Sequence, residues 1–381
     1  MSPSSGTDAI VVGAGIIGAA CALALAVDGW RVTVLDAEFP SAGTTSVGMG
    51  HVVVMDDSPE QLALTAYSSR LWRELAPDLD ARSEVDVCGT LWVAADGEQL
   101  AAVRAKQEVY RSAGVATELL DERALAAAEP NLRPGLAGAL RVPGDSVVYP
   151  PGVTRRLIDL ARTHGAVVRE RTRARAIVAN GVACDDETLH ADVVVNAAGP
   201  SAAALVPRLP IVPRKGHLAI TDRYPGFCRH QLVELGYLAS AHVMTTESVA
   251  FNLQPRSTGQ VLVGSSRELA GWDASLNHDI LARMLRRAVD FVPRLRDLSI
   301  VRCWTGFRPA TPDKLPLIGR WDPVPGLYVA AGHEGLGITT SLATARLLAD
   351  AIAGRPSAID RAPFAPGRVL TGDAPRGEAH A

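Results

Sequence analysis

Three glycines near the N-terminus have the spacing of a phosphate-binding turn. Gly13, Gly15 and Gly18 form the pattern G-x-G-x-x-G after an apolar run at residues 9–12, and an apolar stretch suited to a helix starts at Ile16. The first glycine permits a tight turn, the second lets a pyrophosphate approach the backbone, and the third lets the helix pack closely on the strand. The N–H groups at the start of such a helix favour the negative charge of phosphates.

An acidic residue stands at the distance that a ribose contact requires. Gly29 ends the expected helix, residues 31–35 read as a second strand, and Asp36 follows directly. Its carboxylate is placed to accept hydrogen bonds from a ribose hydroxyl. A glycine turn that binds nothing is the alternative, but the strand, helix and acid together favour a dinucleotide site. From these residues alone, NAD and FAD fit nearly equally well.

A second strand, glycine turn and helix occur near the C-terminus. Residues 327–331 are strand-like, residues 332–337 read GHEGLG, and residues 338–353 have helical spacing of apolar side chains. The N-terminus of that helix would point at an electron-rich group. No second G-x-G-x-x-G is available for a separate nicotinamide cofactor, so the two units together favour one extended molecule, FAD. Residues 43–57 are rich in small and hydroxyl side chains that suit a phosphate or ring system, although an ordinary polar loop is the alternative.

The elements that position these turns indicate an α/β fold built from separate segments. The apolar strand at residues 193–197 ends in Ala198-Gly199-Pro200 and would return the chain beside the first strand. Residues 209–301 contain strand-like runs separated by turns, typical of a largely antiparallel sheet with its own helix, an α+β substrate domain. We expect a discontinuous cofactor domain at residues 1–50, 150–205 and 302–356, a substrate domain at residues 51–149 and 206–301, and a flexible tail at residues 357–381.

Composition narrows the class of partner. The 381 residues are 48% hydrophobic and carry a net charge of −3 with no long basic run, which argues against nucleic acid or an anionic membrane surface and favours a small molecule. The five cysteines are dispersed without C-x-x-C spacing, which argues against a disulfide framework, a metal site or an iron-sulfur cluster in this chain. No apolar stretch reads as a membrane span, so we expect a cytoplasmic protein and no integral membrane protein.

Several segments together resemble the FAD-dependent amino-acid oxidases and dehydrogenases of the D-amino-acid oxidase type, which include glycine oxidase and sarcosine oxidase. The matching segments are VVGAGIIGAACALALA with Asp36, GTTSVGMG, VVVNAAGP, WTGFRPATPDKLPLIG and GLYVAAGHEGLGITTS, spread over nearly the whole chain. Within that family, GTTSVGMGHVVVMDD and GHEGLGITTS look closest to the flavin subunits of D-hydroxyproline dehydrogenase and hydrogen cyanide synthase. The resemblance implies a Rossmann-like FAD domain and partner subunits with an iron-sulfur cluster that accept the electrons. Through these partners the chain would lie peripheral to the inner membrane.

The resemblance also implies which residues hold the cofactor. Sarcosine oxidase links its flavin to a cysteine that aligns near Gly306, so we expect non-covalent FAD here. The expected cofactor contacts are Gly13, Gly15, Ile16, Ile17, Gly18, Asp36, Ala37, Thr44, Thr45, Ser46, Gly48, Met49, Gly199, Gly332, Gly335, Leu336, Gly337, Ile338 and Thr339.

Arg308, in the segment GFRP, matches the position that binds the substrate carboxylate in glycine oxidase. Its planar fork suits a bidentate carboxylate contact, which a lysine could not reproduce. Judged without the motif, a structural or surface role would be the simpler interpretation. The substrate pocket departs from glycine oxidase at Asn252, where that family member has a tyrosine, and at Arg267, where it has a methionine. Arg267 would either reach a polar substituent such as a ring hydroxyl or form a surface ion pair.

Three further side chains are candidates for the substrate pocket: Met49, His51 and His333. For His333 a packing or hydrogen-bonding role is the alternative, and His51 would otherwise be an ordinary strand residue. We assign no catalytic base, because a flavin carries the chemistry and the protein supplies orientation and electrostatics.

The resemblance implies an enzyme that oxidises the C–N bond of a small D-amino acid, of the D-proline or hydroxy-D-proline type, to the imine by hydride transfer to flavin N5. One alternative is a glycine or sarcosine oxidase that produces peroxide. Another is a non-catalytic FAD-binding subunit that passes electrons.

Overall fold

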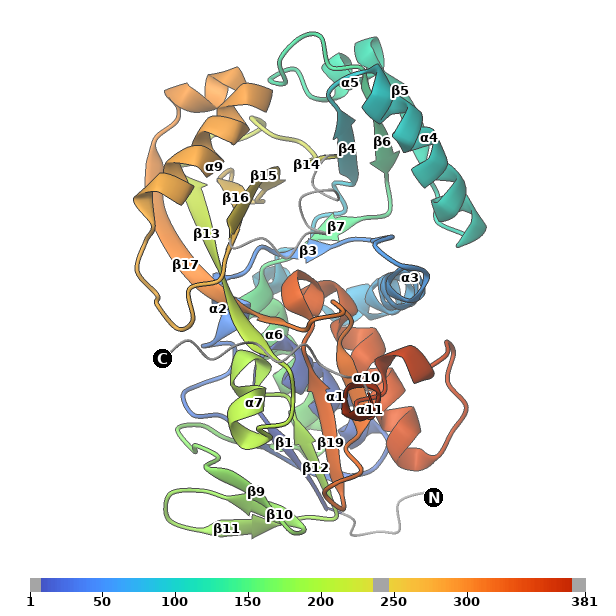
Figure 1. Cartoon of the computed structure of the whole chain (residues 1–381), viewed down its shortest axis with the longest axis vertical. Coiled ribbons are helices and arrows are strands. Elements are labelled where there is room, and N and C mark those ends of the chain that lie inside the picture. Colours follow the sequence, from blue (N-terminus) through green and yellow to red (C-terminus); the bar gives the residue numbers. More distant parts are fainter. Residues whose placement is uncertain (1–7, 236–246, 372–381) are drawn as a thin grey trace.

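Two large sheets occupy opposite halves of the molecule in the computed structural model, which describes residues 8–235 and 247–371 (Figure 1). The six-stranded sheet lies in the lower half of the view and the eight-stranded sheet in the upper half, with a layer of helices between them. This mixed α/β architecture, with one mainly parallel and one mainly antiparallel sheet, confirms the expected fold class.

The six-stranded sheet collects strands from widely separated parts of the chain. Its order is β18 (Leu317–Arg320), β19 (Leu327–Ala331), β12 (Val193–Asn196), β1 (Asp8–Val12), β2 (Arg31–Leu35) and β8 (Val167–Arg169). All pairs are parallel except β18 with β19. The predicted return of residues 193–197 to the side of the first strand is therefore observed, and it explains why the two glycine turns can meet at one edge of the sheet.

Four helices cover this sheet and join it to the other half. The apolar helix α1 (Ile16–Val27) packs between α6 (Pro150–Thr163) and α10 (Gly337–Ala353), and α10 packs in turn on α3 (Pro59–Leu75). Eight of the twelve residues of α1 are buried, which accounts for its almost uniformly apolar sequence. Ser58 caps α3, since its side chain accepts a hydrogen bond from the Gln61 N–H, as the sequence Ser-Pro-Glu-Gln at residues 58–61 favours.

The eight-stranded sheet is antiparallel apart from one parallel pair, β14 with β4. Helix α9 (His278–Phe291) packs on it through stacked rings of Phe251 and Phe291, 4.4 Å apart, and α4 (Gly97–Ser112) and α5 (Glu122–Ala128) cover its other end. The strand order is β17 (Ile300–Ala310), β13 (Val212–Thr221), β16 (Val261–Glu268), β15 (Glu247–Pro255), β14 (Gln231–Glu234), β4 (Thr90–Ala94), β6 (Gly138–Val142) and β5 (Glu118–Asp121).

Smaller elements complete the described chain. Strands β9 (Ala176–Val178), β10 (Gly181–Ala183) and β11 (Thr188–His190) form a separate three-stranded sheet. Strand β3 (His51–Val52) pairs with β7 (Ser146–Val147) between the two large sheets, and the short helices α2 (Thr44–Val47) and α7 (Ala202–Leu205) follow glycine turns.

The structure corrects three boundaries. Strand β17 pairs along its length with β13, so residues 302–310 belong to the eight-stranded sheet and the expected division at residue 302 falls inside a strand. The apolar run at residues 51–55 reads as one strand, but the strand covers only His51–Val52. Residues 357–371 are no flexible tail: Phe364 is 1% exposed in the core, and the Arg368 guanidinium pairs with Asp313. Residues 372–381 lie outside the described part of the chain.

One helical stretch, Glu334–Ala353, has the length and hydropathy of a membrane span, contrary to the expectation that none exists. Because 56% of it is buried within the fold, and core helices share this pattern, the stretch is weak support for a membrane segment.

Candidate functional site

The first glycine turn is held at close contact, which only glycine permits. Gly13 has φ +103°, and a Cβ there would lie 2.6 Å from the Ala197 carbonyl oxygen. A Cβ on Gly18 would lie 1.8 Å from the Gly13 carbonyl oxygen. Helix α1 therefore packs directly on the turn, and its N-cap residue Gly15 offers no side chain to cap the first N–H groups.

Helix α2 lies across the start of α1. The Thr45 hydroxyl accepts a hydrogen bond of 3.0 Å from the Ile16 N–H, and a Cβ on Gly15 would lie 3.2 Å from that hydroxyl. The Thr44 hydroxyl donates to the Phe307 carbonyl, and the Ser46 hydroxyl donates to carbonyls one turn before it. The three predicted hydroxyl residues thus fix α2 beside the glycine turn.

Asp36 lies at the end of β2, where a ribose contact was expected. Its Oδ2 accepts a hydrogen bond of 2.7 Å from the Ala14 N–H, and its Oδ1 accepts one of 2.9 Å from the Glu38 N–H. The carboxylate therefore ties the glycine turn to the loop after β2, with Ala37 exposed beside it. Gly199 (φ +55°) has open space where a Cβ would be, so a ligand can approach its backbone.

The C-terminal glycine turn brings α10 to the same region. A Cβ on Gly48 would lie 3.7 Å from Ile338, which places α2 beside the first turn of α10. Helix α10 also begins without a side-chain cap. The Thr339 hydroxyl donates to the His51 carbonyl and accepts from the Val53 N–H, so it fixes the segment from β3 onward against α10. The backbone turn at Gly332 (φ +82°) packs on Thr311.

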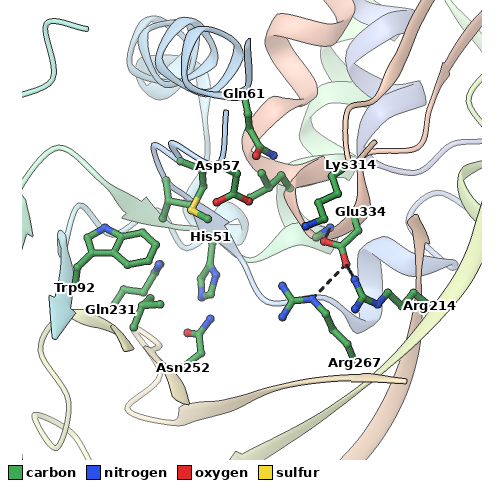
Figure 2. Close-up of a pocket in the computed structure, with 15 residues that line it drawn as sticks. His51, Asp57, Gln61, Trp92, Arg214, Gln231, Asn252, Arg267, Lys314 and Glu334 are labelled. Atoms are coloured by element: carbon green, nitrogen blue, oxygen red, sulfur yellow. Dashed lines mark hydrogen bonds and ion pairs between the residues drawn. The ribbon is translucent and has the colours of Figure 1, made fainter. Parts of the chain in front are cut away.

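A cavity with about 690 Å³ of empty volume, including its open mouth, lies between the C-terminal turn and the eight-stranded sheet (Figure 2). Figure 2 shows Arg214, Arg267, Lys314 and Glu334 at one side of it and Trp92, Gln231, Asn252 and His51 at the other, with Asp57 and Gln61 between the two groups. Its lining residues are His51, Val53, Met55, Asp57, Gln61, Trp92, Arg214, Gln231, Val233, Asn252, Arg267, Lys314, Glu334, Gly335 and Leu336.

Glu334 is the centre of the charged side. Its Oε1 lies 3.4 Å from Arg214 and 3.4 Å from Arg267, and its Oε2 accepts a hydrogen bond of 3.0 Å from the Gly335 N–H. Burial alone would raise the pKa of the Glu334 carboxyl. The positive charges of Arg267, Arg308 and Arg214 outweigh that effect and lower the pKa from 4.5 to about 2. The carboxyl is therefore ionised at neutral pH, and Lys314 adds a further cation to the same side of the cavity.

Arg308 lies next to this group without lining the cavity. It is directly opposite Arg214 in the pairing of β17 with β13, and its guanidinium packs on Gly216, where a Cβ would be 2.3 Å from Nη1. The same nitrogen donates a hydrogen bond of 2.9 Å to the Ser266 carbonyl. Like charges in directly opposed positions repel, so nearby carboxylates are needed to hold Arg214 and Arg308 together.

The other side of the cavity is uncharged. Trp92, Gln231 and Asn252 are 1%, 2% and 6% exposed and point toward His51 (Figure 2). Burial lowers the pKa of His51 to about 3, so its imidazole is neutral at physiological pH.

The structure separates the predicted pocket residues into two groups. His51, Asn252 and Arg267 line the cavity. The ion pair considered for Arg267 is present, with Glu334, but Arg267 is 4% exposed, so the pair is buried and does not lie at the surface. Met49 and His333 do not line it, which corrects their assignment to the pocket. The Met49 sulfur packs on Gly264, and the buried His333 ring pairs with the Thr344 hydroxyl at 3.0 Å, the structural role considered for it.

Ten lining residues were not among the predicted site residues: Val53, Met55, Asp57, Gln61, Trp92, Arg214, Gln231, Val233, Lys314 and Glu334. Five of them lie in segments that had been singled out: Val53, Met55 and Asp57 in residues 43–57, Lys314 in WTGFRPATPDKLPLIG, and Glu334 in the GHEGLG turn. Arg214 and Gln231 are polar residues within buried strands, which is the one signal that could have marked them.

A family model described as "FAD dependent oxidoreductase" matches residues 8–351, almost the whole described chain. The chain belongs to this family. The predicted resemblance to the D-amino-acid oxidase type is thereby confirmed, as is FAD as the cofactor.

Curated relatives span the full length of the chain. A glycine oxidase of Pseudomonas aeruginosa is 29% identical over 94% of this chain and 98% of its own length. The hydrogen cyanide synthase subunit HcnC of the same species is 29% identical over 94% of this chain and 95% of its own length. A D-amino acid dehydrogenase of Xanthobacter autotrophicus is 32% identical over 93% and 97%. The family therefore includes enzymes named for amino-acid oxidation and dehydrogenation.

A solved structure supports the same placement. The crystal structure of glycine oxidase from Geobacillus kaustophilus superposes with a TM-score of 0.84 at 28% identity, covering 95% of this chain and 98% of that one. The two-sheet architecture is thus that of an FAD-dependent oxidoreductase.

The residues of this chain fit FAD on their own geometry. The cradle at Gly13 and Gly18 leaves no room for a Cβ, and two helices, α1 and α10, begin near α2 at N-cap residues that make no side-chain cap hydrogen bond. The Thr45 hydroxyl accepts from one N–H of α1, that of Ile16. Helix N-termini favour phosphate and other negative charge. Gly13, Gly15, Gly18 and Thr45 would hold the pyrophosphate, and the turn before α10 would hold the electron-rich ring.

Proposed function

We propose that this FAD-dependent oxidoreductase oxidises the C–N bond of a small D-amino acid, of the D-proline or hydroxy-D-proline type, to the imine. The observation that carries the proposal is the group of cations at one side of the cavity: Arg214, Arg267 and Lys314 line it, and Arg308 lies beside them, opposite Arg214 on β17. These four cations face two carboxylates, Glu334 and Asp57, so the site has an excess of positive charge that suits a substrate carboxylate.

The protein's part in the reaction is to bind and orient the substrate. Arg308, next to the Glu334 group, would hold the carboxylate through two parallel N–H bonds, as the motif GFRP predicts. FAD, when bound, supplies the hydride acceptor. With the carboxylate fixed, the α C–H has one preferred orientation, and that ordering supplies much of the rate enhancement in such enzymes.

The side chains around the cavity favour a neutral amine in the reactive substrate. His51 is neutral and Lys314 and the arginines repel an ammonium group, so the amine would lose its proton on entering the site. Its lone pair then assists departure of the hydride. No side chain is needed as a base for the C–H bond.

The electron acceptor is proposed to be a partner subunit. The relative HcnC is named as a subunit of a synthase, and D-amino acid dehydrogenase is the name of another relative. An iron-sulfur partner is consistent with the dispersed cysteines of this chain. We place the protein in the cytoplasm, associated with the membrane through such partners.

Anaerobic bleaching of the bound flavin by a panel of D- and L-amino acids tests the proposal. D-proline and hydroxy-D-proline are expected to remove the flavin absorbance near the visible maximum, and their L-forms are expected to leave it. If no amino acid bleaches the flavin, the chain is a non-catalytic electron-transfer subunit and the proposal fails.

A glycine oxidase activity is the second candidate, because a glycine oxidase is both a relative and a structural neighbour at 28–29% identity. Bleaching by glycine or sarcosine, with stoichiometric peroxide on admission of air, would establish it. Asn252 and Arg267 stand where that enzyme type has tyrosine and methionine, which favours a different substrate here.

A further inference from the structure

One wall of the cavity is built by a row of residues in register across three strands of the eight-stranded sheet. Val233 on β14 is paired with Trp92 on β4 and with Asn252 on β15. Cross-strand partners point to the same face of a sheet, and so does Gln231, two residues before Val233. Figure 2 shows Trp92, Gln231 and Asn252 together on this wall, with His51 facing them. We call these four residues the neutral wall.

Each residue of the neutral wall has a buried polar atom without a hydrogen-bond partner in the described part of the chain. The atoms are Trp92 Nε1, Gln231 Oε1, Asn252 Oδ1 and His51 Nε2. A buried polar group without a partner costs about 1–3 kcal/mol, so folded proteins rarely keep several together. Four such residues lining one cavity indicate a ligand with hydrogen-bonding groups of its own.

The chemistry of the wall limits what that ligand group can be. Tryptophan, glutamine, asparagine and the neutral His51 imidazole carry no charge, and the Lys106 ammonium behind the Trp92 ring is paired with Asp56. A charged group would need an opposite charge to offset its loss of hydration. The wall offers both donors and acceptors, which suits a hydroxyl or a carboxamide.

The charged side of the cavity determines how a substrate would be oriented in it. Arg267, which sequence reasoning considered for a ring hydroxyl, pairs with Glu334, and Figure 2 shows its guanidinium between Glu334 and the neutral wall. A register shift between Val249 and Asn252 in the pairing of β15 with β16 accompanies this placement of Arg267. The cations at one side of the cavity therefore suit the carboxylate of a substrate, and the neutral wall at the other side suits an uncharged polar substituent.

Resting on the proposed function, we infer that the neutral wall is a specificity subsite for an uncharged hydrogen-bonding substituent, a hydroxyl or a carboxamide, on the carbon skeleton of the amino-acid substrate. Glycine and unsubstituted proline leave the wall without partners. Hydroxy-D-proline supplies one, so within the proposed substrate class the hydroxylated member is preferred.

Matched substrate pairs test the inference on the full-length holoenzyme. The pairs are hydroxy-D-proline with D-proline, and D-asparagine with D-leucine, which has a similar shape without the amide. We expect kcat/KM to favour the polar member by at least about tenfold, because a site built to hydrogen-bond a substrate group discriminates against the analogue that lacks it. A ratio near one in the wild-type enzyme would overturn the inference while leaving the proposed function intact.

Variants assign the preference to the wall. Gln231→Met and Asn252→Leu remove the polar atoms at nearly constant shape. Each variant should bring the ratio of kcat/KM for the polar substrate to that for its apolar partner toward one. Gln107→Met, on α4 away from the cavity, makes the same change outside the site and should keep the wild-type ratio. A ratio that stays high in both wall variants would also overturn the inference.

Ligand affinity separates this inference from the proposed function. If no D-amino acid is turned over, the proposed function fails, and the Kd values of 3-hydroxybutyrate and butyrate, measured from perturbation of the flavin spectrum, decide the inference instead. Tighter binding of the hydroxy acid that is lost in Gln231→Met supports the subsite. Equal affinities reject it.

Discussion

Arg214 and Arg308 occupy directly opposed positions on two antiparallel strands, an arrangement that is unfavourable unless anions lie close by. Glu334 supplies one such anion, at 3.4 Å from Arg214. A substrate carboxylate would supply another and would further reduce the repulsion. Relief of the repulsion between Arg214 and Arg308 would therefore contribute part of the binding free energy of an anion at this site.

Arg308→Lys and Arg308→Ala test this at the position that the motif predicts to hold the carboxylate. Both variants lose the planar fork, so kcat/KM for the best amino acid should fall on the order of a hundredfold or more, with the charge retained only in the lysine variant. Arg302→Ala is the matched control, because Arg302 is exposed on the same strand β17. Steady-state kinetics with unchanged kcat/KM in the alanine variant would remove Arg308 from the site.

The ionised Glu334 carboxylate should stabilise the fold in a pH-dependent way. Its pKa is lowered from 4.5 to about 2 in the folded protein, so its contribution is complete above about pH 4.5 and is lost as the pH falls toward 2. Glu334→Gln should therefore lower the free energy of unfolding at pH 7 by on the order of 3 kcal/mol. Urea unfolding at several pH values measures the difference, which should shrink below pH 4.5.

The exposed residue Glu74 provides the comparison for that series. Glu74→Gln should change the unfolding free energy at pH 7 little, because an exposed carboxylate gains little from folding. A Glu334→Gln deficit that persists unchanged down to pH 3 would contradict the electrostatic explanation and indicate a packing effect.

At the scale of elements, the cofactor site depends on how closely helices approach the backbone turns. Helix α1 is held against the first turn at Gly18, and α2 is held against α1 by the hydrogen bond from Ile16 to Thr45. Helix α10 meets α2 at Gly48 and Ile338. Small shifts of one helix would therefore move the N–H groups that are proposed to hold the cofactor.

Gly18→Ala should weaken FAD retention by about tenfold or more, because a Cβ 1.8 Å from the Gly13 carbonyl oxygen forces α1 away from the turn, and such overpacking costs about 1–3 kcal/mol. The ratio of flavin to protein absorbance after dialysis, and a titration with added FAD, measure the effect. Gly97→Ala at the first residue of α4, where a Cβ meets no atom within 4 Å, should retain full flavin content. Wild-type retention in Gly18→Ala would show that α1 can shift without harm.

Local sequence signals predicted the elements well, and the reason is physical. The glycine spacing, the Ser58 cap and the acid after β2 each act within a few residues, so their types determine the backbone. The charged and neutral sides of the cavity arise differently. Arg214 meets Arg308, and Trp92 meets Val233 and Asn252, only through the register of strands far apart in the sequence. No spacing rule in one sequence specifies that register.

At the scale of the whole molecule, the electrons taken from a substrate must leave through an acceptor. Cys21 and Cys228 are buried, and burial raises the pKa of the Cys21 thiol to about 12, so it is protonated at physiological pH. Residues 8–235 and 247–371 contain no group of three or more histidine, cysteine, aspartate or glutamate side chains that could hold a metal ion. The choice of electron acceptor tests the proposed partner subunit.

A dehydrogenase of this kind should turn over faster with an artificial electron acceptor than with oxygen. Steady-state rates with a soluble dye under argon, compared with peroxide formation in air at the same substrate concentration, measure the ratio. The Arg308→Ala variant supplies the control, since dye reduction that depends on the substrate site should fall with it. Brisk peroxide formation that matches the dye rate would instead identify an oxidase, because oxygen then removes the electrons from the flavin as fast as the substrate delivers them.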